Sequence, residues 1–289
     1  FNVSNSLWID QRFPIYKDFL DRCKLGFDAN ANVLDFQSPA APKSINDWIK
    51  EKTEGKITKV IESLKRDERL ILVNTVYFKQ PWKEPFKEFQ TKDDKFTKTD
   101  GKEVQCKMMN ISHGFGYVTS DDAIFVSMPF KDQNCQMLII LPNEKGDGSL
   151  LNVAKKYLEA NEFKGVVEGI THRKLNLSLP RIKAKFSTSL KNTLINMGLA
   201  NPFSEDADFS LISPEKLFIS DVIHEAILDI NEHGVEAAAV TVVRMNLMMG
   251  MVSREPPPIP VRIDRPAVVV LYLKSTKLVA FVGLIKDVE

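Results

Sequence analysis

The feature that most constrains the fold of this sequence is a run of apolar residues at positions 69–78. The apolar side chains occupy both alternating faces of the segment and comprise Leu70, Ile71, Leu72, Val73, Val76, Tyr77 and Phe78. A strand with one face in water alternates apolar and polar residues, whereas a strand covered on both faces does not. The run therefore predicts a central strand of a sheet with cover on both sides.

Further strand and helix patterns follow along the chain. Strands are predicted at 32–36, 123–130, 136–141, 174–179, 217–230, 267–273 and 278–284. Helices are predicted at 14–25, 42–53, 149–163 and 189–197. Strands outnumber helices and come in runs, and the sequence shows no internal repeat and no interdomain linker. This pattern favours an α+β protein with large sheets.

The composition excludes several classes of function. The chain has 39 Lys and Arg against 38 Asp and Glu, a net charge of +1 that is too balanced for nucleic-acid binding. Its most apolar runs, 240–252 and 267–273, fall short of the roughly 18 uninterrupted apolar residues of a membrane span. Three distant cysteines, Cys23, Cys106 and Cys135, exclude a disulfide scaffold. We therefore expect no nucleic-acid partner and no membrane segment.

Three Asn-X-Ser patterns fit the N-glycosylation acceptor, at Asn2, Asn110 and Asn176. So short a pattern also arises by chance, and Asn176 falls in a predicted strand. The cellular compartment stays open, with a lean towards secretion.

The residues that could carry catalysis do not form a recognisable site. The four histidines are His113, His172, His224 and His233. His224 and Glu225 begin a string like the zinc motif HExxH, but Leu228 occupies the position of the second ligand. The sequence also has no GxSxG elbow and no GxGxxG turn. We therefore expect no metal, no cofactor and no enzymatic activity.

The strand predicted at 217–230 gives His224 a defined direction. Alternation places His224 on one face with Val222 and Ala226, and places Asp221, Glu225 and Asp229 on the other face. His224 is thus predicted to face the core with a hydrogen-bond partner, and the face that carries Glu225 to point away from the core.

An unusual segment, residues 234–241 (GVEAAAVT), follows that strand. In an extended conformation one face carries Val235, Ala237, Ala239 and Thr241, and the charges of Glu236 and Arg244 fall on the other face. An ordinary amphipathic strand or an alanine-rich helical turn would have the same composition. Residues 256–260 hold four prolines and are expected to be stiff and extended, at a sheet edge or outside the sheet.

These segments resemble those of the serpins, the serine-protease-inhibitor family. Residues 232–241 (EHGVEAAAVT) resemble the hinge of the family's reactive loop, and residues 73–82 (VNTVYFKQPW) resemble its central-sheet signature. Further matches occur in family order at 45–48, 55–57, 108–109, 179–181, 201–204, 208–210, 264–266 and 281–283. The resemblance covers nearly the whole chain. A typical serpin has roughly a quarter of its fold before the point where this chain begins, so a longer parent protein is expected.

The resemblance implies a serpin fold, with large, mainly antiparallel sheets, surrounding helices and an exposed reactive loop. It implies one serpin domain at 1–289, N-terminally incomplete, with hinge and reactive loop at 232–258. An inhibitory serpin is a suicide substrate with a metastable fold: a serine protease cuts the loop and forms an acyl-enzyme, and the hinge inserts into the central sheet. The expected partner is therefore a serine protease in a covalent complex with a monomer, which could also polymerise through its loop.

The same resemblance assigns roles to individual residues. The hinge comprises Glu232, Gly234, Val235, Glu236, Ala237, Ala238, Ala239 and Thr241. Val235 replaces the hydroxyl residue that is common in the family, but it is uncharged, so insertion is still expected. Asn74 and His224 match a polar pair that controls opening of the sheet, Arg181 and Glu232 match an ion pair at its top, and Trp82 lies in the same opening region.

Two counts place the bond offered to the protease differently, because the loop is longer than is usual in the family. Counting forward from Glu232 gives Met248–Met249, whereas counting back from residues 264–266 gives Arg254–Glu255. We favour Met248, because the length inserted after the hinge determines how far the protease is moved. Met248 suits a chymotrypsin-like or elastase-like pocket, and Arg254 suits a trypsin-like one. A non-inhibitory serpin that acts as a carrier or chaperone is the alternative function.

Overall fold

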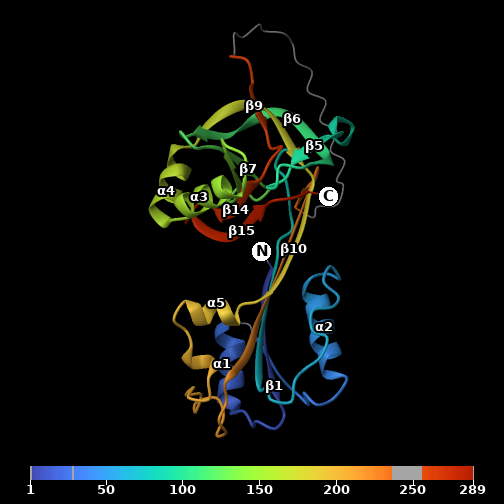
Figure 1. Cartoon of the computed structure of the whole chain (residues 1–289), viewed down its shortest axis with the longest axis vertical. Helices are drawn as coiled ribbons and strands as arrows, with labels where there is room; N and C mark the ends of the chain where they lie inside the picture. The colour runs from blue at the N-terminus through green and yellow to red at the C-terminus, as the bar shows by residue number, and fades with distance from the viewer. Residues whose placement is uncertain (1, 28, 236–255, 289) are drawn as a thin grey trace. The chain divides into compact units, whose positions relative to one another are not determined.

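The computed structural model describes residues 2–27, 29–235 and 256–288. These residues group into two compact units, Phe1–Phe78 with Lys185–Leu228, and Lys79–Ala184 with Asp229–Glu289. Strands β10 (Ile182–Ser189) and β11 (Ile219–Asn231) have residues in both units. Figure 1 shows the course of the chain through its elements. The expectation of a single domain stays a prediction.

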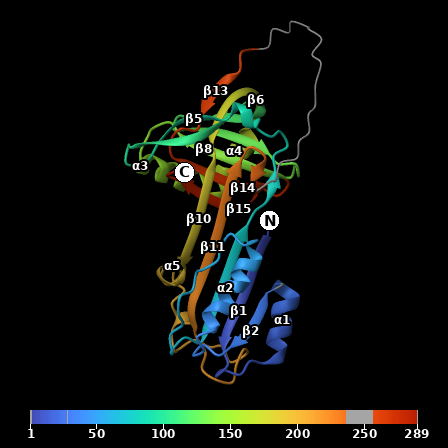
Figure 2. The ribbon, with the colours of Figure 1, turned by 90° about the vertical axis from the view of Figure 1, so that its right-hand side faces the viewer.

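The first unit is built on a mixed sheet. Its elements are β1 (Asn2–Asp10), α1 (Lys17–Phe27), β2 (Asn30–Leu34), α2 (Ala41–Lys52), β3 (Leu70–Tyr77), α5 (Lys191–Asn196) and the 3-10 turn η2 (Asn201–Phe203). The strand order is β2-β1-β3-β11, and β10 pairs with β11. β3 is therefore a central strand, as predicted, and β10, β11, β1 and β2 are visible side by side in Figure 2. The β1–β2 and β3–β11 pairings are parallel, whereas β1 pairs antiparallel with β3.

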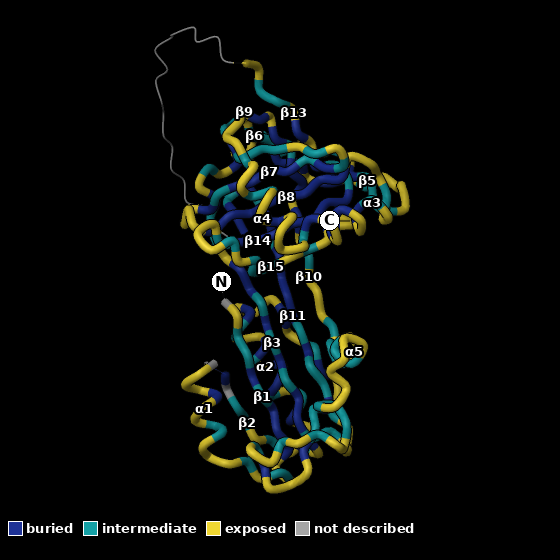
Figure 3. The backbone as a smooth tube through the Cα atoms, turned by 90° about the vertical axis from the view of Figure 1, so that its left-hand side faces the viewer, coloured by how far each residue is buried: buried dark blue, intermediate teal, exposed yellow. Residues whose placement is uncertain are grey.

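One core cluster of this unit lies between α2 and one face of the sheet, and a second one contains Ile9, Leu70 and Leu217. Pro42 stands in the first turn of α2 and Lys50 and Lys52 in its last turn, as suits the ends of a helix. The buried cluster includes Ile45 and Ile49 of α2, Ile71 and Val73 of β3, and Ile223 and Ile227 of β11. Alternate residues of β3 are only half-buried, and Figure 3 shows buried and intermediate residues along the strand. The predicted cover is therefore complete on the face of Ile71 and Val73 alone.

One buried side chain holds the segment that follows α2. The amide nitrogen of Asn46 donates to the carbonyl of Ile61 at 2.7 Å. Its oxygen accepts from the backbone nitrogens of Val60 at 2.8 Å and Ile61 at 3.0 Å. Because Ile57 and Ile61 belong to the same buried cluster, Asn46 fixes further cover over this face of the sheet.

The second unit contains a sheet with the order β13-β9-β6-β7-β8-β14-β15, in which β5 pairs with β6. The strands of this second unit are β4 (Gln80–Pro81), β5 (Lys92–Thr97), β6 (Glu103–Thr119), β7 (Ala123–Pro129), β8 (Cys135–Pro142), β9 (Thr171–Pro180), β12 (Gly234–Val235), β13 (Ile259–Arg262), β14 (Ala267–Leu273) and β15 (Leu278–Ile285). Of these strands, β4 and β12 pair with each other, and β12 pairs with β11, outside the sheet just described. The helical segments are η1 (Glu88–Gln90), α3 (Asp147–Tyr157) and α4 (Ala160–Gly169). The sheet is mainly antiparallel, as expected, with a parallel β13–β9 pair at one end.

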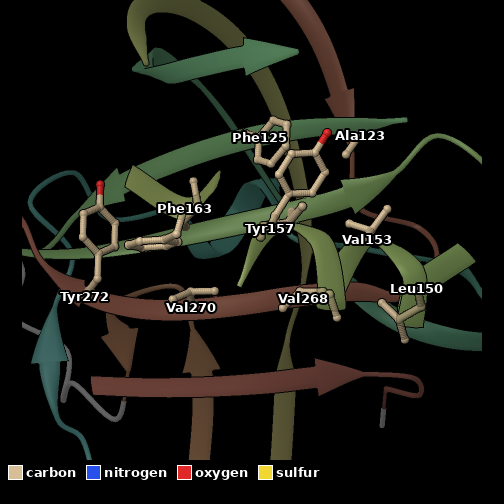
Figure 4. Close-up of a cluster of buried hydrophobic side chains, with 12 residues drawn as sticks. Ala123, Phe125, Leu150, Val153, Tyr157, Phe163, Val268, Val270 and Tyr272 are labelled. Carbon is tan, nitrogen blue, oxygen red and sulfur yellow. The ribbon is translucent and has the colours of Figure 1, made fainter. Parts of the chain in front are cut away.

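Two helices stand where the sequence predicted one at 149–163. The backbone at Glu159 is extended, with φ −64° and ψ 138°, so α3 ends before this residue and α4 starts after it. The break allows Tyr157 and Phe163 to join the same buried cluster, in which Phe163 meets Tyr272 edge-on at 5.5 Å between ring centroids. Figure 4 shows these rings with residues of β7 and β14. Packing of α3 and α4 into one buried cluster therefore outweighs the helical pattern that runs through residues 149–163.

Strand β6 was not predicted, nor were β1, β5 and β10. β6 carries Gly114 and Gly116, which weaken a strand pattern in sequence. A Cβ at Gly114 would lie 2.1 Å from His172 Cε1, so the glycine admits the ring of a residue on the neighbouring strand β9. The need for glycine at position 114 comes from His172, which is distant in sequence, so the residues around Gly114 do not indicate it.

Candidate functional site

The chain after β11 is anchored in the second unit by an ion pair between the exposed Arg181 and the buried Glu232. The Glu232 side chain is 2% exposed, and its Oε1 lies 2.8 Å from Arg181 Nη2. Arg181 Nε donates to both carboxylate oxygens at 3.0 Å, and Thr91 Oγ1 donates to Oε1. Burial acts to raise the pKa of Glu232, but the hydrogen bonds from Arg181 and Thr91 outweigh it, so the pKa is lowered. Glu232 is thus held as a carboxylate.

Gly234 forms the next point of constraint. Its φ is +148°, and a Cβ there would lie 2.2 Å from the carbonyl oxygen of Gln80 and 2.6 Å from Pro81 Cα. The backbone at this turn therefore requires glycine. The residue after it, Val235, is 0% exposed and pairs antiparallel with both Ile230 and Gln80. The predicted hinge thus begins as a short, buried strand.

Trp82 holds the turn between β11 and β12. Its indole nitrogen donates to the carbonyl of Asn231 at 2.9 Å, and its backbone nitrogen donates to the carbonyl of His233 at 2.8 Å. The ring stacks on Phe130 with 4.7 Å between centroids. His233 in turn lies 3.0 Å from Glu88 Oε1. The buried indole therefore fixes the backbone on both sides of Glu232.

In the first unit, β3 and β11 meet in a parallel seam, formed by residues 70–77 and 219–227, which we call the β3–β11 seam. His224 and Asn74 are in register across it, and His224 Nδ1 lies 2.7 Å from Asn74 Oδ1. Because an amide oxygen can only accept, Nδ1 is the donor. Asn74 Nδ2 then donates to Asn5 Oδ1 of β1 at 2.7 Å. One chain of hydrogen bonds therefore joins three strands, and burial lowers the pKa of His224.

The prediction for the opposite face of β11 is wrong. Glu225 is 0% exposed instead of pointing away from the core, because the face it shares with Ile223 and Ile227 is the one that α2 covers. Ser187 Oγ donates to Glu225 Oε1, and burial raises the pKa of this carboxyl. His224, in contrast, is only half-buried.

The other residues of the predicted hinge and loop lie outside the residues that the structure describes. Glu236, Ala237, Ala238, Ala239 and Thr241 of the hinge lie outside the described residues. The two candidate bonds, Met248–Met249 and Arg254–Glu255, lie there as well.

Sequence reasoning missed three partners of the predicted residues. Thr91 bonds Glu232, Asn5 bonds Asn74, and Ser187 bonds Glu225. Each comes from a segment far from its partner in sequence, and no local pattern around it marks the contact.

Residues 2–27, 29–235 and 256–288 contain no cluster of three or more His, Cys, Asp or Glu side chains able to hold a metal ion. In the same part of the chain, no helix has the length and apolar character that crossing a membrane requires.

Comparison with known proteins decides the family. The model of the Serpin (serine protease inhibitor) family matches residues 1–288. The chain belongs to the serpin family. Among relatives of this serpin, a serine protease inhibitor of Cyanea capillata is 30% identical over 292 residues, covering 99% of the chain and 75% of the relative. Alpha-1-antichymotrypsin of Pongo abelii is 30% identical over 291 residues, covering 98% and 66%.

An uncharacterized serpin-like protein of Thermococcus kodakarensis is 31% identical over 282 residues, covering 96% of this serpin and 64% of the relative. The chain therefore spans between 64% and 75% of the length of these relatives.

Solved structures agree with the fold expected from sequence. The thermophilic serpin tengpin in its native state is similar with a TM-score of 0.87 and 26% identity, over 99% of this chain and 73% of that one. Human thyroxine-binding globulin in complex with thyroxine has a TM-score of 0.87 and 25% identity, over 99% and 74%. The α+β serpin fold is thereby confirmed.

Proposed function

We propose that this serpin inhibits serine proteases as a suicide substrate, through cleavage of its loop and insertion of the hinge between β3 and β11. The main support for this proposal is the constrained turn that connects β11 to the proposed hinge. Glu232 and Gly234 fix a tight turn there, and the face that starts at Val235 carries no charge along the following residues. A buried unpaired charge would cost several kcal/mol against insertion. The names of the inhibitors from Cyanea capillata and Pongo abelii support the same activity.

Strand direction favours insertion at the β3–β11 seam. β3 and β11 are parallel, and β12 already runs antiparallel to β11. A hinge that continues from β12 would run antiparallel to both neighbours. Insertion would then replace one parallel pairing by two antiparallel pairings, which are slightly more stable per residue. Each added backbone hydrogen bond contributes about 0.5–1.5 kcal/mol net.

The covalent step follows the ordinary chemistry of serine proteases. The protease serine oxygen attacks the carbonyl carbon of Met248, and the peptide bond to Met249 breaks. The nitrogen of Met249 leaves as an amine with the proton that the serine gave up. An ester between the protease serine and Met248 remains, and insertion moves the protease before water can hydrolyse it.

The target class follows from the bond that is cut. Met248, preceded by Leu247, suits an apolar specificity pocket of a chymotrypsin-like or elastase-like protease. Arg254–Glu255 is the alternative and would suit a trypsin-like pocket with an acidic floor.

The experiment incubates the protein that carries this chain with chymotrypsin, neutrophil elastase or trypsin. A denaturing gel detects the covalent complex, and mass spectrometry identifies the released carboxy-terminal peptide. A complex with a peptide that starts at Met249 supports the first assignment, and one that starts at Glu255 moves the target to trypsin-like enzymes. Complete cleavage without any complex contradicts inhibition.

A matched pair of variants tests the uncharged face directly. We expect Ala239→Arg to turn the inhibitor into a substrate, because the alternation of the hinge places Ala239 on the inserting face with Val235. Ala238→Arg places the same charge on the other face and should still trap the protease. Equal trapping by both variants would refute insertion of that face. Val235→Arg would not separate an effect on insertion from an effect on the uncleaved fold, because Val235 is already buried there.

A second candidate function is ligand carriage without inhibition. The observation in its favour is the similarity to thyroxine-binding globulin, whose structure was solved with thyroxine. A carrier of this kind would be cut by the proteases without complex formation and would gain little stability on cleavage.

A further inference from the structure

Next to the Asn74–His224 pair, the β3–β11 seam carries two buried oxygen atoms that have no hydrogen-bond partner in the part of the chain that the structure describes. Thr75 and Glu225 are in register across the seam, and both residues are 0% exposed. Ser187 Oγ donates to Glu225 Oε1. Among the described residues, neither Glu225 Oε2 nor Thr75 Oγ1 has a hydrogen-bond partner. Paired residues point to the same face of a sheet, so both oxygens lie on the face that α2 covers.

The surroundings of these two oxygens are mostly apolar. The same face carries Ile71 and Val73 on β3, and Ile223 and Ile227 on β11. Helix α2 and the segment after it add Ile45, Ile49, Ile57 and Ile61. An unpaired polar group in such a place loses its hydration without compensation.

Charged groups near the pair do not offset that loss. On α2, Lys43, Asp47, Lys50 and Glu51 are exposed, and the half-buried Lys52 pairs with Glu51 at 3.0 Å. In the covering segment, Lys59 and Glu62 pair with each other at the surface. Lys185 of β10 favours the carboxylate form of Glu225 and Ser187 donates to it, but burial is the larger effect and raises its pKa.

We propose that Thr75 and Glu225 form a weak point built into the closed β3–β11 seam, which favours separation of these two strands. Opening the seam lets water or an entering strand reach both unpaired oxygens. On the opposite face, the Asn74–His224 hydrogen bond joins the same strands, so adjacent residue pairs act in opposite directions. The consequence for inhibition rests on the proposed function, because there the hinge enters at this seam.

The first test compares two isosteric substitutions of buried threonines. Thr75→Val removes an unpaired hydroxyl and should raise the melting temperature of the uncleaved protein by about 2–5 °C. Thr53→Val is the matched control, because Thr53 is also 0% exposed but its hydroxyl donates to the Ile49 carbonyl and accepts from the Ile57 nitrogen. That control should lower the melting temperature. A fall for Thr75→Val, or no change, as a bound water would cause, overturns the proposal.

The second test uses Glu225→Gln and the pH. A folded-state pKa above the ordinary 4.5 means that the stability associated with neutral Glu225 is lost as the pH rises through that raised pKa. The amide variant cannot ionise. Its melting temperature relative to the parent should therefore rise as the pH increases from about 4 to 8. A difference that stays constant with pH contradicts a buried, poorly compensated carboxylate.

The third test connects the weak point to inhibition. If Thr75→Val stabilises the closed seam, a smaller fraction of cut molecules should hold the protease covalently, while Thr53→Val should leave that fraction unchanged. An unchanged fraction for Thr75→Val would show that the pair does not govern insertion. Failure of the proposed function looks different, because then even the parent protein forms no complex and gains no stability on cleavage.

Discussion

At the scale of single residues, the ion pair between Arg181 and Glu232 anchors the start of the proposed hinge. Arg181→Gln removes the cationic partner and leaves the buried Glu232 carboxylate with neutral donors, among them Thr91. Breaking a buried pair costs about 3–5 kcal/mol, and the partial exposure of Arg181 reduces this to about 2 kcal/mol at neutral pH. Urea unfolding of parent and variant measures the difference.

The pH dependence of that difference has a defined sign. The pKa of Glu232 is lowered from the ordinary 4.5, so its stabilisation is present above that pH and lost as the pH falls through the lowered pKa. Parent and variant should therefore converge in acid. Arg173→Gln is the control, because Arg173 is exposed and donates to the neighbouring His172 carbonyl at 3.2 Å. A constant difference across the pH range would contradict the role of the ion pair.

At the scale of elements, the chain of hydrogen bonds from His224 through Asn74 to Asn5 holds β11, β3 and β1 together. Asn74→Leu should cost about 1–3 kcal/mol, because it removes both bonds and leaves the half-buried His224 and Asn5 without these partners. Asn5→Ala removes one of them and should cost less. Both values come from denaturant unfolding, and equal losses would show that the His224 bond contributes nothing.

Protonation of His224 should weaken the same set of strands. Burial lowers the pKa of His224 below the ordinary 6.5, so the unfolded chain binds the proton more readily. The stability that depends on neutral His224 is therefore lost as the pH falls from about 6.5 through the lowered pKa. His224→Gln should flatten this part of the stability profile measured between pH 7 and 5. An identical slope in parent and variant would contradict the assignment.

At the scale of the whole molecule, cutting the reactive loop should stabilise the protein. Insertion of roughly ten residues adds backbone hydrogen bonds of about 0.5–1.5 kcal/mol each, which corresponds to a rise in melting temperature on the order of 15 °C or more. Differential scanning calorimetry before and after limited proteolysis measures the rise. Ala239→Arg should be cut equally well but gain much less. An equal gain in both proteins would indicate a source of stability other than insertion of that face.

Much of the architecture could be predicted from local patterns. Positions 69–78 and 42–53 became β3 and α2 nearly as expected. The first is a short, nearly continuous apolar run, and in the second the apolar residues recur with the period of a helix. The single helix predicted at 149–163 is two helices, and strand β6 was not predicted. The break between α3 and α4 lets the rings of Tyr157 and Phe163 pack in the same buried cluster, and β6 needs the space that Gly114 leaves for His172.

Local patterns were enough to predict the strands and helices named above, the uncharged face of the proposed hinge and the resemblance to the serpins. The burial of Glu225, the bond from Thr91 to Glu232 and the bond from Asn74 to Asn5 depend on the folded chain. The physical reason is that alternation along one strand separates its two faces but does not show which face another element covers. That choice depends on side chains such as Ile45 and Ile49, which lie far away in sequence and meet β11 only in the folded core.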